Sequence, residues 1–151
     1  MSLNKILDEQ VIATNIDAKN KNEALLILSE KLLNAGYIND INSFLEDIYY
    51  RESLGATGIG NYIAIPHGQS DSVLRNGIAI GKFNQEIEWE TLDDKGVKLI
   101  FLFSVSANND GANEHLMLLA QLAGKLGNDD VIDRLLEAND SQEIKQIFTS
   151  Y

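Results

Sequence analysis

Residues 51–68 read RESLGATGIGNYIAIPHG, and this is the most informative stretch in the chain of 151 residues. It ends in Pro66-His67-Gly68 and contains one of only two histidines. Pro66 fixes its own φ and favours an extended backbone at Ile65, while Gly68 lets the chain turn away without a side chain. We therefore expect the imidazole of His67 at the end of a short strand, with little backbone freedom and open space beside it.

Periodic patterns on the N-terminal side predict one strand and two helices. Residues 11–16 are typical of a short strand, and Asn20 is a candidate cap for a helix that ends near Gly36. Apolar residues at 41, 44, 45, 48 and 49 follow the i, i+3, i+4, i+7, i+8 spacing of a second helix. Arg51 is then expected at or just past the C-terminal turn of this helix.

The C-terminal half is predicted to alternate between strands and helices. Strands are expected at residues 62–65 and 77–83, and the continuous apolar run 97–105 indicates a central strand buried on both faces. Residues 108–112 are expected to form a loop before a helix at about 113–126 that buries Leu116, Leu119, Ala120 and Ala123. Two short helices are expected around residues 131–137 and 141–148. Helices before, between and after strands predict an α/β fold with a sheet covered on both sides, and the absence of repeats or linkers predicts a single domain over residues 1–151.

Composition argues against several classes of partner. There are 12 Lys and Arg against 23 Asp and Glu, which gives a formal net charge of −11. Nucleic acids and anionic membrane surfaces are therefore not expected partners, because both need a basic face. The chain has no cysteine, no apolar run long enough to span a membrane and no signal-peptide pattern, so we expect a cytoplasmic protein.

Each histidine has a chemical and an ordinary interpretation. A neutral imidazole is a good nucleophile near pH 7, so His67 could accept a phosphoryl group; from composition alone, a histidine packed at a strand end is the more common case. His115 is expected in the first turn of a helix, where the helix dipole disfavours imidazolium. It could donate a hydrogen bond to a phosphoryl oxygen and orient His67, or it could be a surface histidine in a helix cap.

Arg51 and the glycine-rich residues after it are candidates for an anion site. The guanidinium could hold phosphoryl oxygens, although an arginine is also ordinary at a helix C-terminus. The Thr57 hydroxyl could bind phosphate or bond its own backbone. Backbone amides from Gly58 to Gly60 could form an anion-binding concavity. Thr57, Gly58 and Gly60 are therefore the candidate phosphate-binding residues.

Other chemistries have weaker support in the sequence. Two histidines far apart, with no cysteine, do not indicate a zinc site. No nucleophile elbow is present for a Ser-His-Asp hydrolase, and the glycines are not followed by the Gly-Lys-Ser/Thr of a P-loop. We therefore expect neither a metal nor a cofactor.

The stretch 51–68 resembles the active-site segment of the fructose/mannitol-type enzyme IIA domains of the bacterial sugar phosphotransferase system. That family's pattern is close to R-E-x-x-x-x-T-G-I-G-x-x-I-A-I-P-H-G, and each fixed position is matched. The family's second signature, a histidine in a Glu-His-Leu setting, is present at residues 114–116. The resemblance extends over about residues 7–148.

This resemblance implies a three-layer α/β/α sandwich with a central mixed β-sheet. It implies that His67 is the phosphorylated histidine, that His115 lies beside it and that Arg51 helps to stabilise the transferred group. The phosphorylated histidine carrier protein would donate the phosphoryl group, a IIB component would accept it, and a IIC membrane permease would use it to phosphorylate an entering sugar of the fructose or mannitol class. Nitrogen-regulatory IIA proteins resemble the chain in the same motifs, so the alternative is a binding switch set by phosphorylation of His67.

Overall fold

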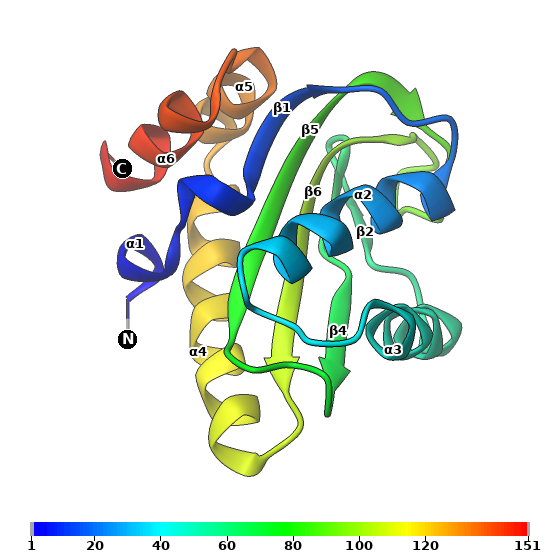
Figure 1. The fold of residues 1–151 in the computed structure, drawn as a ribbon. Coiled ribbons are helices and arrows are strands. Elements are labelled where there is room, and N and C mark those ends of the chain that lie inside the picture. Colours follow the sequence, from blue (N-terminus) through cyan, green and yellow to red (C-terminus); the bar gives the residue numbers. More distant parts are fainter. Residues whose placement is uncertain (1, 151) are drawn as a thin grey trace.

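Strand β6 (Val97–Ser106) lies inside a six-stranded mixed sheet in the computed structural model, which describes residues 2–150 (Figure 1). It pairs antiparallel with β5 (Gly77–Ile87) on one side. On the other side it pairs in parallel with two short strands in turn, β3 (Ile63–Ala64) and β4 (His67–Ser70). Both faces of β6 are covered, which explains its continuous apolar run.

Two further strands complete the sheet. Strand β1 (Ile12–Ile16) lies parallel to β5 at one edge, and β2 (Gly58–Gly60) pairs antiparallel with β3 at the other. Parallel and antiparallel pairs therefore occur in the same sheet, as the resemblance implied.

Helices cover the two faces of the sheet in separate groups (Figure 1). One face carries α2 (Lys21–Asn34) and α3 (Ile41–Leu54). The other face carries the short helix α1 (Leu3–Ile6), α4 (Asn109–Leu126), α5 (Asp129–Glu137) and α6 (Ser141–Ser150), while a 3-10 turn, η1 (Glu9–Val11), leads into β1.

The hydrophobic core is accordingly divided into two layers. Phe101 and Phe103 of β6 pack in the layer with α4 to α6, whereas Ile100 and Leu102 pack in the layer with α2 and α3. This alternation follows from the two-residue period of a strand. The predicted three-layer α/β/α architecture is confirmed.

The caps of α2 and α3 are encoded locally. The side chain of Asn20 accepts a hydrogen bond from the backbone N–H of Glu23 at 2.9 Å, as predicted, and Asp40 accepts one from Ser43 at 3.1 Å. Gly36 follows α2 with a φ of +83°, a conformation that favours glycine.

Helix α4 differs from the prediction at its start. It begins at Asn109, because the side chain of Asn108 accepts a hydrogen bond from the N–H of Gly111 at 2.7 Å and caps the helix there. Residues 108–112, predicted to be a loop, are therefore the cap and first turn of α4.

The buried side of α4 also differs. The helix buries Leu118, Leu122 and Leu126, and Leu119 is partly buried. Leu116, Ala120 and Ala123 are exposed instead. Apolar residues occupy every position from 116 to 120, so periodicity alone could not select the side that faces the sheet.

Candidate active site

A cleft of about 560 Å³ lies where α3, β4, the end of β6 and α4 meet. Each of these elements contributes lining residues: Asp47, Tyr50, Arg51, Leu54, His67, Gln69, Val105, Ala107 and His115. The three residues predicted to be catalytic, which are far apart in the sequence, therefore line one cleft.

His67 is placed by a break in the edge of the sheet. Strand β3 ends at Ala64. The N–H of Ile65 donates a hydrogen bond to the carbonyl of Thr57 at 2.9 Å, and Pro66 has no N–H that could donate one. Pairing with β6 resumes at the next residue, where the backbone N–H of Phe103 donates a hydrogen bond to the carbonyl of Pro66 at 3.0 Å. His67 therefore starts β4 rather than ending a strand, which corrects the prediction.

Gly68 serves close packing rather than a turn. It lies within β4, and a Cβ added there would come within 2.2 Å of Cε1 of Phe44 on α3. A side chain at this position would push α3 away from the sheet. Glycine thus lets the helix that carries Arg51 approach the strand that carries His67.

The imidazole of His67 lies between two rings. It stacks on Phe103, its partner in the β4–β6 pairing, with centroids 5.5 Å apart and an interplanar angle of 22°. The edge of His115 meets it with centroids 4.7 Å apart and an interplanar angle of 89°. This packing fixes the plane of the imidazole while part of it still faces the cleft.

His115 lies in the second turn of α4, not in the first as predicted, because the helix starts earlier. It precedes Leu118 and Leu122 on the side of α4 that faces the sheet. Its ring therefore contacts Phe103, with centroids 4.8 Å apart, as well as His67. The surface-cap alternative for His115 is wrong, since the residue is half-buried and its ring packs inside the site.

Both imidazoles are neutral at pH 7. Burial is the largest cause that lowers the pKa of His67 from 6.5 to about 4, followed by repulsion from His115 when that ring is protonated and by the charge of Arg51, while the backbone of Ile65 opposes the shift. Burial likewise lowers the pKa of His115. Among residues 2–150 no group hydrogen-bonds Nδ1 of His67 or Nδ1 of His115, although both atoms are buried. A neutral imidazole has one ring nitrogen with a free lone pair and one that can donate a hydrogen bond.

Arg51 is in the last turn of α3, as predicted. Its Nη1 donates a hydrogen bond to the carbonyl of Gly55, the C-cap of that helix, at 3.1 Å. The same side chain lines the cleft with His67. The arginine therefore complements the helix C-terminus and also supplies a positive charge to the cleft.

Several residues of the cleft were not predicted. Asp47, Tyr50 and Leu54 share with Arg51 the i, i+3, i+4, i+7 spacing of one side of α3, and this spacing could have identified them. Gln69 lies two residues after His67 on the same side of β4. Phe103 does not line the cleft but stacks on His67, and it could be found only from the pairing of β4 with β6.

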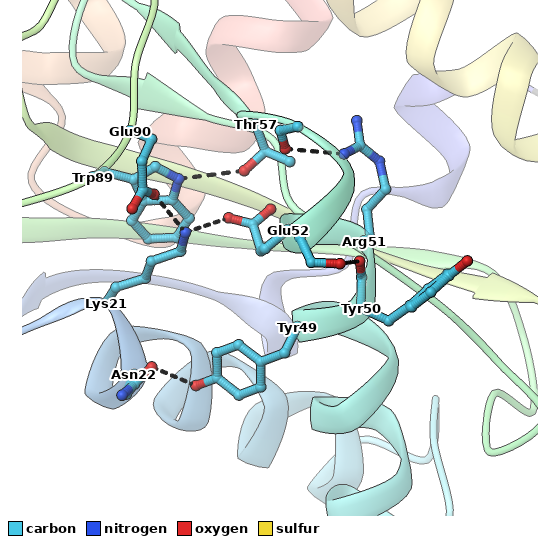
Figure 2. A network of polar contacts seen from close by, with 11 residues as sticks. Lys21, Asn22, Tyr49, Tyr50, Arg51, Glu52, Thr57, Trp89 and Glu90 are labelled. Carbon is cyan, nitrogen blue, oxygen red and sulfur yellow. Dashed lines mark hydrogen bonds and ion pairs between the residues drawn. The ribbon is translucent and has the colours of Figure 1, made fainter.

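Thr57, Gly58 and Gly60 do not line the cleft. The hydroxyl of Thr57 is buried and accepts a hydrogen bond from Nε1 of Trp89 at 3.3 Å (Figure 2). Gly58 and Gly60 lie in β2, where an added Cβ would meet Thr91 at 2.4 Å and Asp93 at 3.2 Å, respectively. These residues pack against the segment between β5 and β6, and their contact with phosphate stays a prediction.

Residues 2–150 contain neither a cluster of metal ligands nor a helix suited to crossing a membrane. In this part of the chain no three His, Asp or Glu side chains gather closely enough to hold a metal ion. No helix within it combines the length and the apolar character needed to cross a bilayer.

The chain is similar to known proteins both in sequence and in overall fold. Residues 5–151 match the family described as phosphoenolpyruvate-dependent sugar phosphotransferase system, EIIA 2. The chain is 32% identical over 151 residues to the fructose-specific EIIABC component of Bacillus subtilis (strain 168), covering 100% of this chain and 24% of that protein. It is 32% identical over 127 residues to the fructose-specific EIIA component of Haloferax volcanii, covering 84% of this chain and 81% of that protein. The chain spans about a quarter of the length of the EIIABC relatives that it matches.

Two solved structures have the same fold. The nitrogen regulatory protein IIA-Ntr from Neisseria meningitidis superposes with a TM-score of 0.87 at 27% identity, covering 97% of this chain and 98% of that one. IIA mannitol from Escherichia coli superposes with a TM-score of 0.79 at 26% identity, covering 94% of this chain and 98% of that one. Since the family model matches nearly the whole sequence, the chain belongs to the EIIA 2 family of the phosphoenolpyruvate-dependent sugar phosphotransferase system.

Proposed function

We propose that this chain is a phosphocarrier that accepts a phosphoryl group on His67 and passes it on. The observation that carries the proposal is the pair of half-buried imidazoles of His67 and His115, with centroids 4.7 Å apart, in a cleft that Arg51 also lines. The donor is a phosphohistidine on the histidine carrier protein, and the acceptor is a IIB component.

The chemistry follows from the protonation states. The lone pair of a His67 ring nitrogen forms a bond to phosphorus while the bond from phosphorus to the donor's imidazole breaks. The Arg51 guanidinium opposes the negative charge on the phosphoryl oxygens, and an N–H of neutral His115 donates a hydrogen bond to one of them. The donor arrives activated, so we propose that no nucleotide, metal or cofactor is needed.

The proposed pathway ends at a sugar of the fructose or mannitol class. Relatives described as specific for fructose and for mannitol support this class. The IIC permease takes part indirectly, by using the phosphoryl group that IIB receives. These steps require a cytoplasmic chain.

A second candidate function is a binding switch, in which phosphorylation of His67 changes the affinity for a regulatory partner. The likeness to a nitrogen regulatory IIA protein, at 27% identity, favours it. The two functions differ in what happens to the phosphoryl group: a transport protein passes it to IIB, while a switch retains it.

The test is to reconstitute the chain with phosphoenolpyruvate, the donor enzyme and the carrier protein. We expect the intact mass to rise by one acid-labile phosphoryl group, and expect no rise in His67→Ala. Adding IIB from the same source should then discharge the wild-type protein. Labelling of His67→Ala would overturn the assignment of His67. Retention of the group in the presence of IIB, with a regulator that binds only one of the two states, would favour the switch.

A further inference from the structure

Glu52 is a buried carboxylate next to Arg51 that the proposed transfer does not use. Its side chain is only 7% exposed, and its Oε1 lies 2.6 Å from Nζ of Lys21. Its Oε2 is buried, and no residue in the described range 2–150 hydrogen-bonds it. The carboxylate therefore depends on one cation, and leaving a buried charge without its partner is strongly unfavourable.

Lys21 is held from several directions. It is the first residue of α2, its Nζ contacts Glu90 at 2.9 Å, and the same atom lies 4.6 Å from the centroid of the Trp89 ring. Burial lowers the pKa of Lys21, but its hydrogen bonds to Glu52 and Glu90 outweigh this, so the pKa is raised and the ammonium stays charged. We call Lys21, Glu52, Trp89 and Glu90 the Lys21 clamp.

The clamp fixes the end of α3 from the side away from the cleft. Figure 2 shows the side chains of Glu52 and Arg51 leaving the last turn of α3 in different directions, with Glu52 toward Lys21 and Trp89. The chain beyond this turn is tied to the same tryptophan, because Thr57 accepts the hydrogen bond of its Nε1–H. The segment from Glu52 to Thr57 is thus held at both ends, and Gly55, to which Arg51 donates, lies between them.

We propose that Glu52 is a positioning residue for Arg51: through Lys21 it holds the last turn of α3 so that the guanidinium faces His67. This inference rests on the proposed function of the cleft. It gives Glu52, which follows Arg51 in the sequence, a role that does not involve contact with the phosphoryl group. A long side chain such as arginine reaches a defined point only when the backbone that carries it is fixed.

The first test uses Glu52→Gln, with Glu90→Gln as the matched control. Both changes remove a carboxylate that contacts Lys21, but the side chain of Glu90 is 75% exposed and that of Glu52 is buried. We expect the single-turnover rate of phosphoryl transfer to fall about tenfold in Glu52→Gln, equal to about 1.4 kcal/mol. We expect it to stay within about twofold of wild type in Glu90→Gln. Thermal melts establish that both variants are folded.

The second test asks whether Glu52 acts through Arg51. In an Arg51→Ala background, Glu52→Gln should cause no further slowing, because the group that it positions is absent. An unchanged rate in the single variant would overturn the proposal. So would an additional tenfold loss in the double variant, since that would mean that Glu52 acts independently of Arg51.

A third measurement does not depend on transfer. Arg51 and Asp47 from α3 and His115 from α4 line the cleft with His67, and the Arg51 charge helps to lower the pKa of His67. An NMR titration should show this pKa rising in Glu52→Gln but not in Glu90→Gln. An unchanged pKa would overturn the positioning role. If the wild-type protein takes up no phosphoryl group, the proposed function fails, and this titration alone decides the role of Glu52.

Discussion

His67 is nearly enclosed by other side chains, and this has a consequence for stability against pH. Its pKa is about 4 in the folded protein and near 6.5 when unfolded. Between these values the unfolded chain binds a proton that the folded protein does not, so stability must fall as the pH decreases from about 6.5 to about 4. His115 acts in the same direction, because burial lowers its pKa too.

We therefore predict that His67→Gln is less sensitive to acid than wild type. Urea unfolding at about pH 7.5 and pH 4.5 should give a loss of stability that is smaller in the variant, by on the order of 2 kcal/mol. Other titrating groups are common to both proteins and cancel in the comparison. Equal losses in the two proteins would mean that the imidazole titrates normally.

Arg51→Lys is predicted not to be a conservative change. A guanidinium can bond two phosphoryl oxygens in one plane, whereas an ammonium is a compact charge on a flexible stem. We expect transfer to slow by roughly tenfold, on the scale of one charge-assisted hydrogen bond, with a thermal melt close to wild type. If the lysine variant transfers at the wild-type rate, Arg51 serves only the C-terminus of α3.

His115→Ala is predicted to stay folded and to slow transfer. The ring packs on Phe103 and its Nδ1 has no hydrogen-bond partner in the described chain. Removing it therefore leaves no polar group unpaired, and we expect a loss of about 1 kcal/mol in stability. Transfer should slow by roughly tenfold through loss of a hydrogen bond to the phosphoryl group. Single-turnover rates for the steps into and out of the chain would check this, and unchanged rates in both would argue against a chemical role.

The residues of the cleft were predictable only in part. Arg51, His67 and His115 carry side chains with recognisable chemistry, and the structure brings all three together. Thr57 has a suitable hydroxyl too, but the sequence could not reveal that this hydroxyl accepts a hydrogen bond from Trp89, which is distant in the chain. Tertiary contacts of this kind decide which polar groups remain free for a ligand.

At the scale of elements, the close contact between α3 and β4 gives a test. Gly68→Ala would place a methyl group against the ring of Phe44, so we predict a loss of about 1–3 kcal/mol from overpacking and slower transfer as α3 shifts. Phe44→Leu provides space and should recover part of the loss in the double variant. Urea midpoints for the two single variants and the double variant measure the coupling. Simple additivity would mean that the two residues do not compete for this space.

The elements that the sequence predicted best are those specified by local signals. The cap at Asn20, the apolar stripe of α3 and the buried run of β6 all matched the structure. Strand β4 was missed because four residues with two exposed or half-exposed side chains have no clear pattern. Its existence depends on pairing with β6, more than thirty residues away in the chain, which no local propensity encodes.

For the whole molecule, the net charge of −11 predicts a salt-dependent encounter with partners that present a basic surface. Raising the ionic strength from about 0.01 M to about 0.5 M shortens the screening length from roughly 30 Å to a few ångströms. We expect kcat/KM for transfer from the carrier protein to fall severalfold, while the rate at saturating carrier changes little. A kcat/KM that does not respond to salt would mean that encounter is not steered by charge.

Trp89, described above as part of the Lys21 clamp, is the only tryptophan in the chain. It is 6% exposed, lies outside the cleft and donates a hydrogen bond to Thr57. When the indole is excited selectively, the fluorescence of the protein has a single source, next to the end of α3. Opening of this region would admit water to the ring and move its emission to longer wavelength. The fluorescence of Trp89 therefore reports, without an added label, on the structure around the last turn of α3, which carries Arg51.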